Sequence, residues 1–149
     1  QISIIEPKPV ENHVFKIARL PLLGPIYLGT ILKNAGYDVR IFNEGISSPY
    51  DDKARCFNDY IQDSDFLLLT GLSSTIKRAY FLAKEFKKLG DKKVMIGGIH
   101  TSFEPFEALR YADYVMVGEG EKVILDAIDS IHSNKKDFKE VCLRRSGGE

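Results

Sequence analysis

Short runs made mainly of apolar residues alternate along this chain with segments whose apolar residues recur at helical spacing. These runs are Ile2–Ile5, Val39–Phe42, Phe66–Leu69, Val94–Ile96 and Tyr114–Val117. A strand without polar positions is buried on both faces, which is typical of a parallel sheet covered by helices on each side. Right-handed crossovers and a repeat of about 25 residues then predict a flavodoxin-like (Rossmann-like) α/β fold, with a doubly wound five-stranded parallel sheet in the order 2-1-3-4-5.

Helix signals fill the spaces between these strands. Pro25 suits a first helical turn, and apolar residues then repeat at helical spacing as far as Gly36, which suits a left-handed helix cap. The same spacing recurs over 76–83 and 124–131, and a short helix is expected to start near Pro105. The predicted helices therefore alternate with the strands, as a doubly wound fold requires.

Three segments are less regular. Asp51 or Asp52 is expected to cap a shorter helix that carries the apolar residues of 57–61. The connection Lys8–Leu23 is long for a compact domain, and loops of that length are often functional. Residues 141–143 are apolar enough to begin another strand.

The charges of the chain balance. Lys and Arg together number 21, as do Asp and Glu, and this neutrality argues against a nucleic-acid-binding protein. No apolar run reaches the roughly 18 residues that span a bilayer, and no secretory signal is visible, so we expect a cytoplasmic protein without a membrane partner. Cys56 and Cys142 are expected to be ordinary thiols, too few to hold an iron–sulfur cluster alone. The first residue is Gln1 rather than Met, which indicates a piece of a longer protein.

The loops after the carboxyl ends of the strands meet at one edge of such a sheet, where doubly wound proteins bind ligands. These loops are Pro7–Leu23, Thr70–Thr75, Gly97–Ser102 and Gly118–Glu121. Gly71 and the pair Gly97-Gly98 leave the backbone open to a bulky ligand, and the hydroxyls of 73–75 suit a phosphate or amide-rich partner. The edge is expected to hold a large ligand rather than to cleave a bond. Leucine at Gly98 is predicted to exclude that ligand without loss of stability, because the loop should lie outside the core.

Each of these signals has a simpler structural alternative. Gly97-Gly98 could serve only as a tight turn, and Ser73–Thr75 only as helix caps. Glu119 and Glu121 could merely complement the dipole of the last helix. Taken singly, the histidines are expected to have structural roles, in a loop or cap (His100), in a proline-flanked loop (His13) and at a helix end (His132). The functional interpretation depends on several loops of small residues that meet at one edge.

Three segments of the chain resemble a known family. The first reads Pro21-Leu22-Leu23-Gly24-Pro25-Ile26-Tyr27-Leu28 and is followed by Ala35-Gly36-Tyr37-Asp38-Val39; the second is Gly97–Pro105 and the third is Asp113–Glu121. They are similar to the opening, the loop after the fourth strand and the fifth-strand segment of the cobalamin-binding domain that precedes many radical S-adenosylmethionine barrels. The resemblance covers nearly the whole chain, and the paired G-G-x-H and G-E-G-E segments are more specific than any single glycine motif.

The resemblance implies that the domain binds cobalamin, with the corrin over the edge of the sheet and the nucleotide tail between the sheet and its helices. By position, it assigns cofactor binding to Pro21, Leu22, Leu23, Gly24, Thr70, Gly71, Ser73, Ser74, Thr75, Gly97, Gly98, His100, Gly118, Glu119 and Gly120. It implies no catalytic residue and no metal ligand in this segment.

The loop after the first strand departs from a better-known pattern. Methionine-synthase-like cobalamin domains carry D-x-H-x-x-G there, and its histidine binds cobalt. Here His13 has no Asp two residues before it and no Gly three residues after it. The radical-enzyme branch usually lacks the motif, so the resemblance implies a corrinoid whose lower face has no protein histidine. His13 as an unexpected ligand is the alternative that stays open.

The C-x-x-x-C-x-x-C motif that holds a 4Fe–4S cluster in the family's barrel is absent from this chain. The resemblance therefore implies a cobalamin-binding domain over 1–140, with 141–149 starting the linker to a downstream radical S-adenosylmethionine domain that would hold the cluster and S-adenosylmethionine. The segment alone is not expected to be an enzyme. The parent protein is expected to be a cobalamin-dependent radical methyltransferase, or a relative of the anaerobic magnesium-protoporphyrin IX monomethyl ester cyclase.

Other classes share the predicted topology. A response-regulator receiver needs a phosphoacceptor aspartate at the end of the third strand, where this chain has Thr70-Gly71. A flavodoxin needs a hydroxyl-rich phosphate loop after the first strand, where this chain has prolines with Lys8 and Glu11. The alternative that stays open is a flavodoxin-like interaction or signalling module that binds no cofactor.

Overall fold

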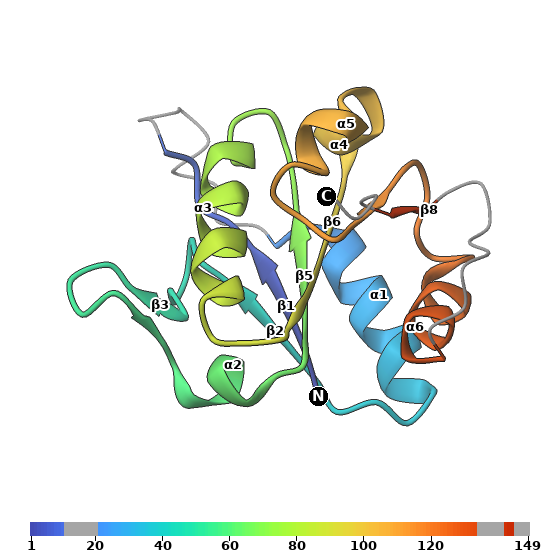
Figure 1. Ribbon diagram of the computed structural model, residues 1–149, viewed down its shortest axis with the longest axis horizontal. Helices are drawn as coiled ribbons and strands as arrows, with labels where there is room; N and C mark the ends of the chain where they lie inside the picture. The colour runs from blue at the N-terminus through green and yellow to red at the C-terminus, as the bar shows by residue number, and fades with distance from the viewer. Residues whose placement is uncertain (11–20, 134–141, 145–149) are drawn as a thin grey trace.

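A six-stranded sheet runs through the described part of the computed structural model, which comprises residues 1–10, 21–133 and the backbone of 142–144 (Figure 1). In order across the sheet, the strands are β2 (Val39–Asn43), β1 (Ile2–Glu6), β5 (Phe66–Thr70), β6 (Lys93–Gly97), β7 (Tyr114–Met116) and β8 (Cys142–Arg144). The first five are parallel, and β8 pairs antiparallel with β7. The predicted flavodoxin-like order 2-1-3-4-5 is confirmed, and the strand expected near residue 141 is an antiparallel addition at its edge.

Side chains along the strands alternate between two buried clusters. Ile4 lies opposite Leu68, and Leu68 lies opposite Met95, so that the three form a row across neighbouring strands on one face. Ile5 and Leu69 belong to the cluster on the other face. All five side chains are buried. Most strand positions are apolar because helices cover each face of the sheet, whereas the exposed Arg40 lies on the edge strand β2.

Helices cover the two faces unequally. α1 (Leu23–Asn34) and α6 (Ile124–His132) pack on one face and contact each other, and α3 (Ile76–Lys87) packs on the other, as Figure 1 shows. Gly36, with φ 92°, ends α1, and Gly90, with φ 126°, follows α3. The predicted helix stop at Gly36 is therefore confirmed, and Gly90 ends α3 in the same way, because only glycine adopts these angles without strain.

The prediction that Asp51 or Asp52 caps a helix is wrong. Asp51 Oδ1 accepts hydrogen bonds from the backbone N–H groups of Lys53 and Ala54, at 2.8 and 3.0 Å, and so closes a turn instead. This turn joins β3 (Tyr50–Asp51) to β4 (Cys56–Phe57), an antiparallel pair that the sequence did not predict.

The helix that follows this pair is shorter than expected. α2 (Asp59–Asp63) begins after Asn58, whose Oδ1 accepts a hydrogen bond from the N–H of Ile61 at 3.0 Å. Farther along the chain, α5 (Pro105–Ala108) confirms the helix predicted near Pro105, and α4 (Ile99–Phe103) precedes it without having been predicted. Thr75 stands directly before α3, but its hydroxyl forms no cap hydrogen bond to that helix.

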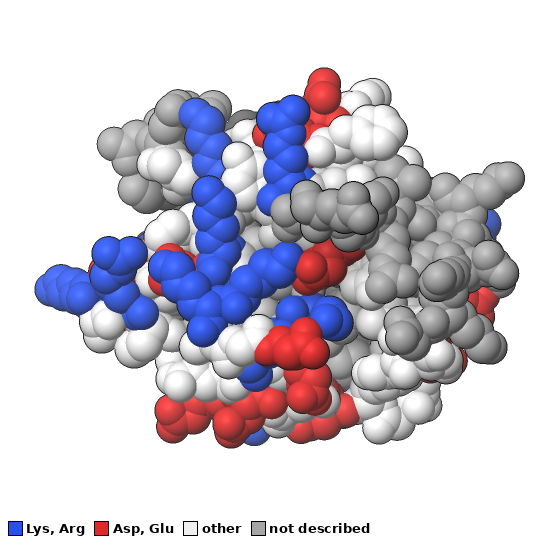
Figure 2. Space-filling model, viewed as in Figure 1, with Lys and Arg blue, Asp and Glu red and all other residues white. Residues whose placement is uncertain are grey.

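The charges are segregated on the surface although they balance overall. Figure 2 shows Lys and Arg side chains gathered over α3, with acidic side chains along the lower edge of the same face. On α3, Lys77, Lys84 and Lys88 are exposed, and Lys88 pairs with Glu85. The neutral composition therefore conceals a locally basic surface. No helix in the described ranges is long and apolar enough to cross a membrane.

Tyr37, just after α1, ties this part of the chain to α6. Its hydroxyl donates a hydrogen bond to Asp129 Oδ1 at 2.6 Å, and its ring stacks on His132. The hydrogen bond to the carboxylate raises the pKa of Tyr37 from 10.0 to about 12. We expect Tyr37→Phe to lower the free energy of unfolding by about 1 kcal/mol, measured by urea denaturation at neutral pH.

The pH dependence gives a second measurement of the same contact. Because the pKa is raised in the folded state, the contribution of Tyr37 to stability is fully present below pH 10.0 and is lost as the pH rises through about 12. The wild type should therefore lose more stability over this pH range than Tyr37→Phe. Identical pH profiles for the two proteins would contradict the contact.

Candidate functional site

A cavity of about 410 Å³ opens at the carboxyl edge of the sheet, between the sheet and the helices α1 and α6. Four parallel strands form its floor, Leu28 of α1 and Ile124 of α6 contribute to its walls, and Thr70 at the end of β5 and the segments after β6 and β7 surround its mouth. This is the edge at which doubly wound sheets bind ligands. The predicted ligand-binding edge therefore contains a real cavity.

The floor of the cavity is apolar. Ile4, Leu68, Met95 and Met116 come from β1, β5, β6 and β7 and line it directly. These residues are also members of the buried cluster on the α1–α6 face. The site therefore suits an apolar, flat group better than a charged one, because few polar side chains are available to replace its hydration.

Small residues leave room around the mouth. A Cβ added at Gly24 or Gly118 would meet no atom within 4 Å. A Cβ at Gly97 would come within 3.3 Å of Met116 Cβ, and one at Gly120 within 3.4 Å of Leu28 Cδ2. All four glycines line the cavity. The mouth is therefore open at Gly24 and Gly118 and closely packed at the other two.

The loops after β5 and β6 contact each other through their backbones. Gly71 N–H donates to the Gly97 carbonyl at 2.7 Å, and His100 N–H donates to the Gly71 carbonyl at 3.1 Å. Gly98 has φ 116°, and a Cβ there would lie 2.8 Å from the Gly71 carbonyl oxygen. The expectation that Gly98 accepts leucine without loss of stability is wrong, because the backbone of Gly71 fills the space that a side chain would need.

Ser102 connects this pair of loops to the loop after β7. Its hydroxyl donates to the Gly98 carbonyl at 3.0 Å and accepts from the N–H of Gly118 at 2.9 Å. Thr101, which is buried, also donates to the Gly98 carbonyl at 3.0 Å. Side-chain hydroxyls of α4 therefore hold the three loops in a fixed arrangement.

The structure brings together about half of the residues predicted to bind the cofactor. Those that line the cavity are Gly24, Thr70, Gly97, Gly98, Gly118, Glu119 and Gly120. Those near it but not on its lining are Pro21, Leu22 and Leu23 at the start of α1, Gly71, Ser73, Ser74 and Thr75 after β5, and His100 in α4. The assignment of each residue to a cofactor stays a prediction.

His100 lies beside the cavity in the loop network. Its Nδ1 is 3.3 Å from the hydroxyl of Ser73, and its buried Nε2 has no hydrogen-bond partner among the described residues. His132 stacks on Tyr37, far along α6 from the cavity lining. His13 lies outside the described residues. Within the described ranges, no three His, Cys, Asp or Glu side chains gather as metal ligands would.

Exposed apolar side chains surround the mouth. Ile99 and Phe103 of α4 line the cavity and are 65% and 79% exposed, and Phe106 of α5 is 76% exposed. Leu23 and Tyr27 of α1 are exposed as well. A large exposed apolar patch marks a binding surface more often than an ordinary surface. The apolar character of the cavity therefore continues onto the rim.

The sequence-based prediction missed the apolar part of the site. Leu28, Leu68 and Met95 have the spacing of core residues, and nothing in that spacing distinguishes a packed position from one that lines a cavity. The only available signal was indirect, because small residues at Gly24 and Gly120 leave the neighbouring apolar side chains uncovered.

Comparisons with known proteins agree with this geometry. The B12 binding domain family matches residues 19–128. A bacteriochlorophyllide d C-8(2)-methyltransferase of Chlorobaculum tepidum is 34% identical over 105 residues, which are 66% of this chain and 22% of that protein. The chain thus spans about a fifth of the length of this curated relative.

Two solved structures share the fold. One is the radical S-adenosylmethionine methyltransferase TsrM of Kitasatospora setae, with cobalamin and a 4Fe–4S cluster bound. The TM-score is 0.71 at 18% sequence identity, and the match covers 97% of this chain and 29% of TsrM. The other is the cobalamin-dependent S-adenosylmethionine radical enzyme OxsB with aqua-cobalamin bound. The TM-score is 0.67 at 18% sequence identity, and the match covers 91% of this chain and 19% of OxsB.

The loop contact at Gly98 leads to a stability prediction. Gly98→Ala forces a Cβ into a backbone conformation that is close to exclusive to glycine and toward the Gly71 carbonyl. We expect it to lower the free energy of unfolding by about 2 kcal/mol or more in urea denaturation. Gly24→Ala is the matched control, because its Cβ meets open space within a helix, and it should be neutral or stabilising. Equal stability of Gly98→Ala and wild type would refute the contact.

Proposed function

The chain belongs to the B12 binding domain family, and from that premise we propose that its cavity receives the nucleotide tail of a cobalamin whose corrin lies over the rim. When bound, cobalamin supplies methyl transfer or redox chemistry at its cobalt, and the protein supplies binding and orientation. The first role of this domain is therefore to hold the cofactor in one place.

The cavity carries this proposal. Its apolar floor and walls suit the planar aromatic base of the tail, and about 410 Å³ accommodates such a base but not the macrocycle as well. The macrocycle would then rest outside, where Ile99 and Phe103 offer exposed apolar surface. Glycines at the mouth allow the chain that joins base and ring to pass close to the backbone.

We assign supporting roles to the remaining predicted residues by their positions. Gly71, Ser73, Ser74 and Thr75 would adjoin the tail from the loop after β5, and His100 would hold Ser73 in place. Glu119 and Gly120 would border the edge of the corrin, as would the segment Pro21–Gly24. None of these residues is assigned an acid–base role.

We further propose that no histidine of this chain binds the lower face of the cobalt. The loop after β1 lacks D-x-H-x-x-G. His100 has its Nδ1 3.3 Å from the Ser73 hydroxyl and its Nε2 buried, and His132 lies at the end of α6 that is far from the cavity. A cobalt without a protein imidazole has one ligand fewer, which alters its redox behaviour.

For the parent protein we propose a cobalamin-dependent radical S-adenosylmethionine enzyme, which transfers a methyl group or performs a redox cyclisation. In support, the curated relative is named a methyltransferase, and the structure of TsrM holds both cobalamin and a 4Fe–4S cluster. Residues 1–140 would form the cobalamin domain, and 141–149 would lead to a downstream domain that binds the cluster and S-adenosylmethionine.

Filling the cavity tests the proposal. Gly24 lines the cavity, and a Cβ added there meets no atom within 4 Å. We expect Gly24→Leu to weaken the binding of hydroxocobalamin by about tenfold or more, because leucine occupies space that the tail needs. The melting temperature should not fall, since leucine is a better helix former than glycine. Binding is measured by equilibrium dialysis with visible absorbance, and stability by thermal unfolding.

Asn34→Leu is the matched control, because it adds the same side chain at the exposed far end of α1. It should bind hydroxocobalamin like the wild type. Wild-type binding by Gly24→Leu would exclude the cavity as the site of the tail. No binding by the wild type itself would reject the cofactor proposal in favour of an interaction module.

The histidine proposal has a spectroscopic test. Cob(II)alamin bound to uniformly ¹⁵N-labelled protein should show no hyperfine coupling from ¹⁵N in its EPR spectrum, because no imidazole of the chain reaches the cobalt. The unlabelled cofactor keeps its own ¹⁴N signature, so the two sources are separable. A ¹⁵N coupling that disappears in His13→Ala or His100→Ala would identify the ligand and overturn this part of the proposal.

A further inference from the structure

The start of α1 forms part of the cavity but lacks a cap of its own. Leu22 precedes the helix without a side-chain cap hydrogen bond, and the first turn contains no acidic residue. Gly24, Pro25 and Leu28, from the first two turns, line the cavity. A helix start carries unpaired N–H groups and partial positive charge, so its position depends on acceptors from elsewhere.

Glu6, at the end of β1, provides such an acceptor. Its Oε2 accepts hydrogen bonds from the backbone N–H of Leu22 at 3.0 Å and from Asn43 Nδ2 at 2.9 Å. Burial raises the pKa of Glu6, although both hydrogen bonds oppose the shift. The two hydrogen bonds therefore offset only part of the cost of burying the ionised carboxylate.

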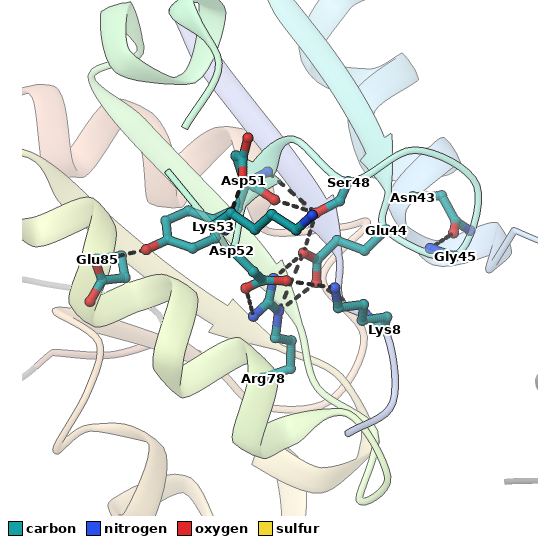
Figure 3. A network of polar contacts seen from close by, with 11 residues as sticks. Lys8, Asn43, Glu44, Gly45, Ser48, Asp51, Asp52, Lys53, Arg78 and Glu85 are labelled. Atoms are coloured by element: carbon teal, nitrogen blue, oxygen red, sulfur yellow. Dashed lines mark hydrogen bonds and ion pairs between the residues drawn. The ribbon is translucent and has the colours of Figure 1, made fainter. Parts of the chain in front are cut away.

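A second carboxylate holds the other end of the segment that joins β1 to α1. The side chain of Glu44 is fully buried and accepts a hydrogen bond from the N–H of Lys8 at 3.2 Å, as Figure 3 shows. Arg78 of α3 fixes Glu44 through Nε at 3.1 Å and Nη2 at 2.8 Å. Arg78 also pairs with Asp52 at 2.7 Å, and Asp52 pairs with the ammonium of Lys8 at 2.9 Å.

The two carboxylates are connected to each other at the end of β2. Glu44 N–H donates to the carbonyl of Glu6 at 3.0 Å, and the neighbouring Asn43 donates to the Glu6 side chain. A continuous polar network therefore runs from Arg78 on one face of the sheet to the start of α1 on the other. Its links are hydrogen bonds and ion pairs, together with the covalent chain that joins Asn43 to Glu44.

We propose that Glu6 and Glu44 are positioning residues for the cobalamin cavity: Glu6 holds the N–H of Leu22 and thereby sets the distance of α1 from the sheet, and Glu44 fixes Glu6 in turn, through its own N–H on the Glu6 carbonyl and its side chain on the N–H of Lys8. The inference rests on the proposed function, since it assigns the residues a role in the same cavity. Neither carboxylate is on the cavity lining, so each acts through the backbone that it holds.

Glu6 offers a matched series for testing this role. Glu6→Leu removes the acceptor, and Glu6→Gln keeps a neutral one. In Glu6→Leu we expect the dissociation constant for hydroxocobalamin to rise by about tenfold, and the amide of Leu22 to exchange with solvent faster in the protein without cofactor. Glu6→Gln should restore both values close to those of the wild type, because its carbonyl still accepts from Leu22.

Glu85→Gln is the control for mere loss of stability. Glu85 is a buried carboxylate that accepts from Tyr50 at 3.0 Å and pairs with Lys88, and among the described residues it has no hydrogen bond or ion pair to Glu6, Lys8 or Leu22. This variant should unfold more easily yet bind hydroxocobalamin like the wild type. Glu44→Gln, which weakens the pair with Arg78, should weaken binding as well.

Two results would overturn the inference. One is wild-type affinity in Glu6→Leu, and the other is a loss of affinity in Glu85→Gln as large as that in Glu6→Leu. If the wild type binds no hydroxocobalamin, the proposed function is wrong. The positioning role of Glu6 is then tested by the hydrogen-exchange rate of the Leu22 amide alone. An unchanged rate in Glu6→Leu would then reject it.

Discussion

The candidate site depends on direct backbone contact between the loops after β5 and β6. Gly71 N–H meets the Gly97 carbonyl at 2.7 Å, and Gly98 lies so close to Gly71 that no side chain fits between them. Ser102 extends this arrangement to the loop after β7. Because these loops hold one another through backbone and hydroxyl groups, no bulky side chain is needed to fix them, and the apolar floor beneath them remains uncovered.

The two faces of the sheet are packed differently, and only the α1–α6 face leaves space for a cavity. On the α3 face, Tyr50, Phe57 and Phe86 pack edge to face and fill the space. On the other face, α1 approaches the sheet closely at its middle, where a Cβ on Gly29 would lie 2.6 Å from Ile41 Cδ1, but leaves open space at Gly24. One face is thus closed by aromatic packing, and the other holds a cavity at the start of its helix.

Much of the fold could be predicted from the sequence, because runs that are apolar on both faces have few solutions and glycine suits the left-handed conformation that ends a helix, as at Gly36. Asp51 was misassigned because its carboxylate satisfies the N–H groups of a turn as well as those of a helix start. The glycine at position 98 indicates from the sequence that a side chain would not fit there, but not that the backbone of Gly71 occupies the space. The apolar lining, such as Leu28 and Met95, has the spacing of an ordinary core, so only the structure distinguishes a cavity from packed interior.

The central claim is that the cavity on the α1–α6 face, and no other surface, receives the tail of a cobalamin. Methyl NMR with Ile, Leu and Met labelling, during titration with hydroxocobalamin, measures this most directly because ring currents of a bound aromatic base shift nearby methyl signals. The account predicts large shifts for Leu28, Met95 and Met116, and none for Leu82 on the α3 face. Shifts confined to the α3 face, or no shift at any methyl group, would contradict it.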